Sequence, residues 1–168
     1  MELSRDKHGK LVADRERFPS GMKALAKYMH DRKLELGIYE DFGTKTCAGY
    51  PGSIDHIKDD ADTFASWDID YLKLDGCYVD IDLMSQALNR TGRPIVYACG
   101  WPLFFHIAHR EHDVFLVVLV SFIRNNSQSL VDYGAVEKAC NSWRIFDDIE
   151  GSWKSILKTI TYVEKYQD

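Results

Sequence analysis

The sequence lacks the segments that would place it in a membrane or mark it for export. Its longest apolar run, Val114 to Ile123, is ten residues long and is interrupted by Ser121, whereas a transmembrane helix needs about 20 residues. The first residues, MELSRDKHGK, contain no apolar core of the kind that a signal peptide carries. We therefore expect a soluble chain with no membrane partner and no visible export signal.

The features of nucleic-acid and nucleotide binding are also missing. The net charge is −5 and no stretch forms a basic stripe, which argues against a nucleic-acid partner. No G-x-G-x-x-G and no Walker-type loop follows a predicted strand, so the nucleotide-binding α/β folds lose support.

The cysteines form no C-x-x-C pair, which argues against a zinc ribbon. Their even number suits two disulfides, for which three pairings are possible, or four buried thiols. Spacing alone does not decide between these alternatives for Cys47, Cys77, Cys99 and Cys140.

The composition, 45% hydrophobic and 28% charged, is that of a globular domain. Strand patterns and helix patterns alternate, which predicts a parallel α/β sheet. Both a doubly wound sheet and a (β/α) barrel fit this alternation. The predicted strands are 34–39, 71–75, 94–99 and 142–146, and the predicted helices lie near 22–29, 57–65, 82–88 and 153–163.

Polar residues gather where the predicted strands end, which favours the barrel, because barrel enzymes carry their chemistry at the carboxyl ends of the strands. The residues concerned are Tyr39, Asp41, Asp75, Arg144, Asp147 and Asp148.

The strand YLKLD (71–75) places Lys73 and Asp75 on one face and the two leucines on the other. In a barrel the leucines would meet the helices, and the polar pair would point inward. A nearby ammonium favours the ionised carboxylate, so Asp75 is a candidate nucleophile. The alternative is a structural ion pair inside the barrel.

The segment WRIFDD (143–148) gives a second candidate. If the strand continues to its end, Arg144, Phe146 and Asp148 share one face, and an arginine beside a carboxylate again indicates a site. The alternative is an acidic loop that opens the next helix, where aspartate is favoured. Two inward carboxylates on different strands are what glycoside hydrolysis requires.

Several motifs, in order, resemble the lysosomal α-galactosidase / α-N-acetylgalactosaminidase family of retaining glycoside hydrolases. They are RFPSGM, GIYEDFGTKTCAGYPGS, YLKLDGC, ALNRTGRPIVYAC, GWPL and WRIFDDI. The resemblance covers nearly the whole chain except about 104–130. It implies a (β/α)8 barrel, of which residues 1–168 would form a partial catalytic domain with four strands and without the family's C-terminal β domain.

The resemblance also implies roles for individual residues. Asp75 would be the nucleophile and Asp148 the acid/base. Tyr39, Lys73 and Arg144 would bind the sugar, with Arg144 holding its 2-substituent. No metal and no organic cofactor is implied, and full-length family members are expected to be homodimers.

The same resemblance pairs Cys47 with Cys77 and Cys99 with Cys140, and it makes Asn89 a glycosylation site. It implies a lysosomal or secreted protein that acts on a terminal α-linked galactose.

The sister activity on α-N-acetylgalactosamine is the nearest alternative. Galactosidases of the family resemble C-E-W-P-L and the sister enzymes C-S-W-P-A, whereas this chain has CGWPL. Leu103 would occupy space that an N-acetyl group needs, whereas Gly100 leaves room for it, so the pair favours galactose only by a small margin.

The chain also departs from the family pattern. The family's tandem aspartates and one tryptophan belong to strands that would precede this sequence, and the segment 104–130 is an atypical insertion. That insertion is either a translated non-coding segment or a genuine loop. A third alternative for function is therefore a truncated, non-catalytic remnant, and we expect residues 1–168 by themselves to be inactive.

Overall fold

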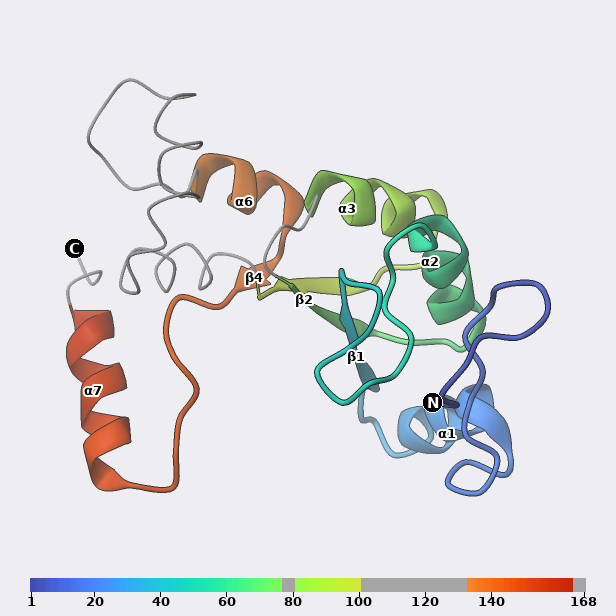
Figure 1. The fold of residues 1–168 in the computed structure, drawn as a ribbon, viewed down its shortest axis with the longest axis horizontal. Helices are drawn as coiled ribbons and strands as arrows, with labels where there is room; N and C mark the ends of the chain where they lie inside the picture. The colour runs from blue at the N-terminus through green and yellow to red at the C-terminus, as the bar shows by residue number, and fades with distance from the viewer. Residues whose placement is uncertain (77–80, 101–132, 165–168) are drawn as a thin grey trace.

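The computed structural model describes residues 1–76, 81–100 and 133–164 (Figure 1). Its elements, in chain order, are α1 (Gly21–His30), β1 (Gly37–Asp41), α2 (Ile57–Ser66), β2 (Tyr71–Asp75), α3 (Ile81–Arg90), β3 (Val96–Cys99), α6 (Tyr133–Ala139), β4 (Ser142–Trp143) and α7 (Trp153–Val163).

The four strands form one sheet in the order β1-β2-β3-β4, and each neighbouring pair is parallel. The predicted parallel α/β sheet is therefore confirmed. Each strand pairs with the next one in the sequence, which is how a (β/α) barrel grows. A doubly wound sheet would place helices on both faces and reverse its strand order.

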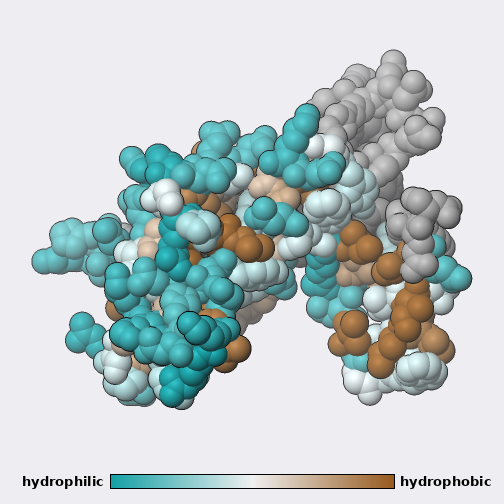
Figure 2. Space-filling view, turned by 180° about the vertical axis from the view of Figure 1, so that it is seen from behind, coloured by the Kyte–Doolittle hydropathy of each residue, from teal (hydrophilic) through white to brown (hydrophobic). Residues whose placement is uncertain are grey.

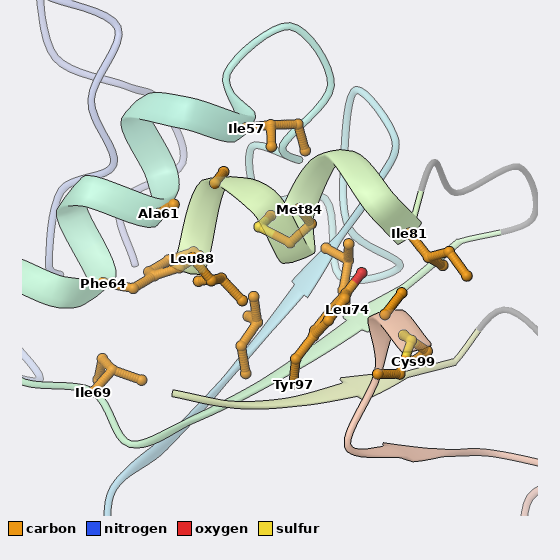
Figure 3. Packing of buried hydrophobic residues seen from close by; sticks show 14 of the residues in the cluster. Ile57, Ala61, Phe64, Ile69, Leu74, Ile81, Met84, Leu88, Tyr97 and Cys99 are labelled. Carbon is orange, nitrogen blue, oxygen red and sulfur yellow. A yellow bond between two sulfur atoms is a disulfide. The ribbon is translucent and has the colours of Figure 1, made fainter. Parts of the chain in front are cut away.

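The core lies on one face of the sheet, between the strands and α2, α3 and α6. Leu72 and Leu74 of β2 are fully buried there, because alternate residues of a strand point to the same side. Figure 3 shows the helices lying over these strands and contributing the opposing side chains. The main ones are Ile57, Ala61, Phe64, Met84, Leu88 and Val136.

On the opposite face several side chains stay partly accessible, among them Tyr39, Tyr71 and Val96. This is the face on which the sequence places Lys73 and Asp75. The one-sided core therefore matches a segment of barrel wall, with helices outside and the polar pair inside.

The fourth strand is shorter than predicted. We expected it to run from 142 to 146, but β4 ends at Trp143. The backbone N–H of Arg144 still donates to the carbonyl of Cys99 at 2.9 Å, and the chain then leaves the sheet. The side chain of Arg144 donates to the carbonyl of Phe146 at 2.9 Å, a local bond within the departing loop.

The last helix, α7, begins at an N-cap, where the side chain of Ser152 accepts from the backbone N–H of Ser155. Figure 1 shows α7 standing apart from the sheet at the end of an extended segment. None of its residues is buried, and Figure 2 shows apolar side chains gathered on it. Trp153, Leu157 and Ile160 are all exposed.

No helix in the described ranges has the length and apolar character needed to cross a membrane. The predicted insertion, 104–130, lies outside the described residues.

Candidate active site

A hollow of about 630 Å³ opens where β2 ends and the chain leaves β4. Three groups of residues line it. From the sheet and its loops come Cys47, Asp75 and Arg144, from the following loop Phe146, Asp147, Asp148 and Glu150, and from the start of α7 Ser152, Lys154, Ser155, Lys158 and Thr159.

Asp75 is the last residue of β2 and is 8% exposed. One of its carboxylate oxygens lies 3.5 Å from the Nζ of Lys73. The same oxygen accepts a hydrogen bond from the hydroxyl of Tyr39 at 3.4 Å, and the other accepts from the backbone N–H of Gly76 at 3.2 Å. Strand alternation and parallel pairing therefore bring together three residues that the sequence proposed for the site.

Tyr39 lies beside Lys73 because the two residues are partners in the β1–β2 register. The Lys73 ammonium lies 5.1 Å from the centre of the tyrosine ring, within range of a cation–π contact. The Tyr39 hydroxyl can also donate to Cys47 Sγ at 3.9 Å. Burial raises the pKa of Tyr39, and the contact with Cys47 and the charge of Asp75 raise it further. Tyr39 is thus a neutral hydrogen-bond donor to Asp75.

Arg144 and Asp148 form an ion pair of 2.7 Å at the rim of the hollow. The prediction that Arg144, Phe146 and Asp148 share a strand face is wrong, because the strand ends before them. Phe146 is buried, whereas the Asp148 side chain is 89% exposed. The arginine and the carboxylate meet across a loop instead.

The neighbouring carboxylate, Asp147, has a different partner. It pairs with Lys158 of α7 at 2.7 Å, and the Lys158 ammonium also lies 5.1 Å from the ring of Phe146. Asp147 therefore connects the loop to α7. The two consecutive aspartates therefore have different partners, a difference that the sequence pattern by itself does not reveal.

Gly100 lies directly against Asp75. Its backbone N–H donates to the carbonyl of Leu74 at 2.8 Å, and a Cβ at this position would collide with the Asp75 carboxylate. The missing side chain leaves the space that the carboxylate occupies. Leu103, the other residue expected to affect the choice between galactose and N-acetylgalactosamine, lies outside the described residues.

Two of the four cysteines are joined. Cys99 and Cys140 form the disulfide that the resemblance implies. Cys47 is exposed and has no disulfide partner among the described residues. Its expected partner, Cys77, lies outside them, so that pairing stays a prediction. Asn89 lies on the exposed surface of α3, and its glycosylation is likewise untested.

The structure adds Asp41 to the site. In the β1–β2 register Asp41 is the partner of Asp75, and burial, together with the charge of Asp75, raises its pKa. Its carboxylate accepts from the backbone N–H of Gly43 at 2.7 Å, which holds the following loop. The end of the predicted strand marks Asp41 as polar, but only the register places it beside Asp75.

One group of described residues could hold a metal ion: His30, Glu35 and Asp70, whose ligand atoms lie within 4.8 Å of one another. It is at the amino end of β2, away from the hollow. Arg93 donates to Asp70 at 2.6 Å, and His30 contacts the other oxygen at 2.6 Å. These contacts already satisfy the carboxylate, so we interpret the group as a structural network.

Comparisons with known proteins agree with this geometry. Residues 1–168 match the family Melibiase_2, described as Alpha galactosidase A. The chain is 43% identical over 172 residues to an α-N-acetylgalactosaminidase of Gallus gallus, and 43% identical over 176 residues to α-galactosidase A of Homo sapiens. These matches cover 98% and 100% of this chain but only 38% and 36% of the two relatives.

Solved structures show the same relationship. α-Galactosidase I of Mortierella vinacea matches with a TM-score of 0.68 and 31% identity, over 89% of this chain and 34% of that one. An α-galactosidase of Saccharomyces cerevisiae, solved with raffinose, matches with a TM-score of 0.55 and 41% identity, over 57% and 24%. The sheet is therefore part of a TIM barrel, and the chain belongs to the Melibiase_2 family of α-galactosidases and α-N-acetylgalactosaminidases.

Proposed function

We propose that the protein containing this chain is a retaining glycoside hydrolase that releases terminal α-linked galactose. The supporting observation is that Asp75 and Asp148, which come from different elements, line the same hollow. Each carboxylate has its own cation, Lys73 for Asp75 and Arg144 for Asp148. Two carboxylates facing one substrate space are the arrangement that this reaction needs.

The environments of the two carboxylates suit different roles. Asp75 is buried and held by Lys73 and Tyr39, which keeps a carboxylate oxygen in a fixed position for attack on the anomeric carbon. Asp148 is exposed at the rim, where it can reach both a leaving group and water. It would protonate the departing oxygen and then deprotonate the water that releases the sugar.

The sister activity on α-N-acetylgalactosamine remains the second candidate. The chicken α-N-acetylgalactosaminidase and the human α-galactosidase A are equally similar to this chain, at 43%. The space beside Gly100 is taken by the Asp75 carboxylate, so it gives no clear room for an N-acetyl group, and Leu103 is the sequence feature that favours galactose. Comparing the hydrolysis of a chromogenic α-galactoside and α-N-acetylgalactosaminide by the whole protein separates the two.

Replacing Asp75 with asparagine tests the proposed nucleophile in the whole protein. We expect Asp75→Asn to abolish turnover with an unchanged melting temperature, and added azide to restore part of the rate. Azide would do so because a small anion can occupy the place of the lost carboxylate. Normal activity of this variant would show that the nucleophile lies elsewhere, and no hydrolysis by the unmodified protein would favour a non-catalytic remnant.

The two consecutive aspartates provide a matched test of the acid/base. Asp148→Asn should lower kcat about 100- to 10,000-fold on a substrate with a poor leaving group, and less on an activated aryl glycoside. Asp147→Asn is the control, because Asp147 pairs with Lys158. It should retain most of the activity, and equal losses in the two variants would contradict the assignment.

The compartment is proposed on a separate observation. The Cys99–Cys140 disulfide suits an oxidising environment, as in a lysosomal or secreted protein.

A further inference from the structure

A buried carboxyl group lies on the opposite side of β1 from the candidate active site. Glu40 lies between Tyr39 and Asp41 in the strand, so its side chain points to the helix-covered face. It is 0% exposed. Its Oε2 accepts from the backbone N–H of Asp41 at 3.3 Å, and its Oε1 has no hydrogen-bond partner among the described residues.

A second carboxylate is buried nearby and takes the available cation. Asp60 of α2 is also 0% exposed. Arg5 binds both its oxygens, at 2.6 and 2.8 Å. The same two guanidinium nitrogens donate to the carbonyls of Gly9 and Gly52, at 2.9 and 2.7 Å. Among the described residues, the guanidinium of Arg5 thus binds Asp60 and the backbone, and it makes no hydrogen bond to Glu40.

The charge balance at this place is therefore unfavourable for an ionised Glu40. There are two fully buried carboxyl groups and one nearby guanidinium, and that guanidinium binds Asp60. An isolated buried carboxylate is so costly that such a group takes up a proton instead.

The surroundings of Glu40 raise its pKa on balance. Burial is the main cause of the increase, and the negative charges of Asp60 on α2 and of Asp41 on the same strand add to it. The hydrogen bond from the N–H of Asp41 and the positive charge of Arg5, in the N-terminal segment, lower the pKa by a smaller amount. The net result raises the pKa of Glu40 to about 8.

We propose that Glu40 takes up a proton when the chain folds, so that the fold is most stable in acidic surroundings and loses stability as the pH approaches neutrality. In the unfolded chain Glu40 would ionise near its ordinary pKa of about 4.3. Between that value and about 8, the folded state holds one proton more than the unfolded state. Stability therefore falls as the pH rises, by up to about tenfold in the folded-to-unfolded ratio per pH unit.

Urea unfolding of the chain at several pH values between about 5 and 8 tests this. Glu40→Gln keeps the shape of the side chain and cannot ionise, so it should match the unmodified chain at pH 5 and be more stable at pH 8. Glu40→Met, which is apolar and of similar length, is a second variant in case the amide of Glu40→Gln impairs folding. Its stability should also lack this pH dependence. Glu16→Gln is the control, because Glu16 is exposed, and it should behave like the unmodified chain.

A second measurement is independent of unfolding. At about pH 6.5 the infrared spectrum should contain a protonated-carboxyl band that is missing in Glu40→Gln. Two results would each overturn the proposal: the same pH dependence of stability in Glu40→Gln and the unmodified chain, or identical carboxyl bands in the two.

Discussion

At the scale of single residues, the missing side chain at position 100 allows the observed position of the Asp75 carboxylate. A Cβ on Gly100 would overlap that carboxylate, so Gly100→Ala must displace the Asp75 side chain or the backbone beside it. We expect kcat of the whole protein to fall about tenfold or more, because misplacing a reacting group by about 1 Å can cost a hundredfold. Hydrolysis of a chromogenic α-galactoside measures this.

The control for that variant is Gly151→Ala. Apart from its two chain neighbours, no described residue has an atom within 4 Å of a Cβ built on Gly151, so its replacement should leave kcat and the melting temperature unchanged. If Gly100→Ala kept full activity, the carboxylate would have another productive position, and Gly100 would not determine its placement.

At the scale of one element, one face of β2 contributes to the stability of the fold and the other carries residues of the candidate active site. Leu74 is fully buried against the helices, so Leu74→Ala should lower the free energy of unfolding by about 2–5 kcal/mol. Lys73 lies on the other face, partly exposed and 3.5 Å from Asp75. Lys73→Ala should change stability by less than about 1 kcal/mol and strongly reduce kcat/KM.

Chemical denaturation and steady-state kinetics of the two variants measure these effects. If Lys73→Ala destabilised the fold as much as Leu74→Ala and left kcat/KM intact, the Lys73–Asp75 contact would be a structural ion pair, the alternative that the sequence left open.

At the scale of the whole molecule, the Cys99–Cys140 disulfide ties the end of β3 to the start of β4. The two cysteines are 41 residues apart in the sequence. Replacing both with alanine removes the cross-link that closes a loop between them in the unfolded chain. This should lower the free energy of unfolding by about 4 kcal/mol. Thermal or urea unfolding measures the loss.

The control is Glu16→Gln, because Glu16 is exposed and far from either cysteine in the sequence. It should change stability by less than about 0.5 kcal/mol. A reductant should lower the stability of the unmodified chain more than that of the double variant. A double variant as stable as the unmodified chain would contradict a stabilising role for the bond.

Much of the fold could be predicted from local patterns. The alternation of strands and helices, the strand 71–75 and the inward direction of Lys73 and Asp75 follow from backbone periodicity, and the structure agrees with them. The end of β4 could not be predicted, because the pattern of 142–146 suits a strand throughout, whereas β4 ends at Trp143.

The sequence by itself determined the family, the candidate carboxylates and the face of the strand on which Asp75 lies, because these depend on motifs and on the alternation of side chains. Only the tertiary structure decided which aspartate pairs with Arg144, why position 100 lacks a side chain, and that Glu40 is buried without a cation. Each of these is a contact between residues far apart in the chain, or a competition for one partner. Such contacts follow from packing, which the order of residues along a strand or helix does not contain.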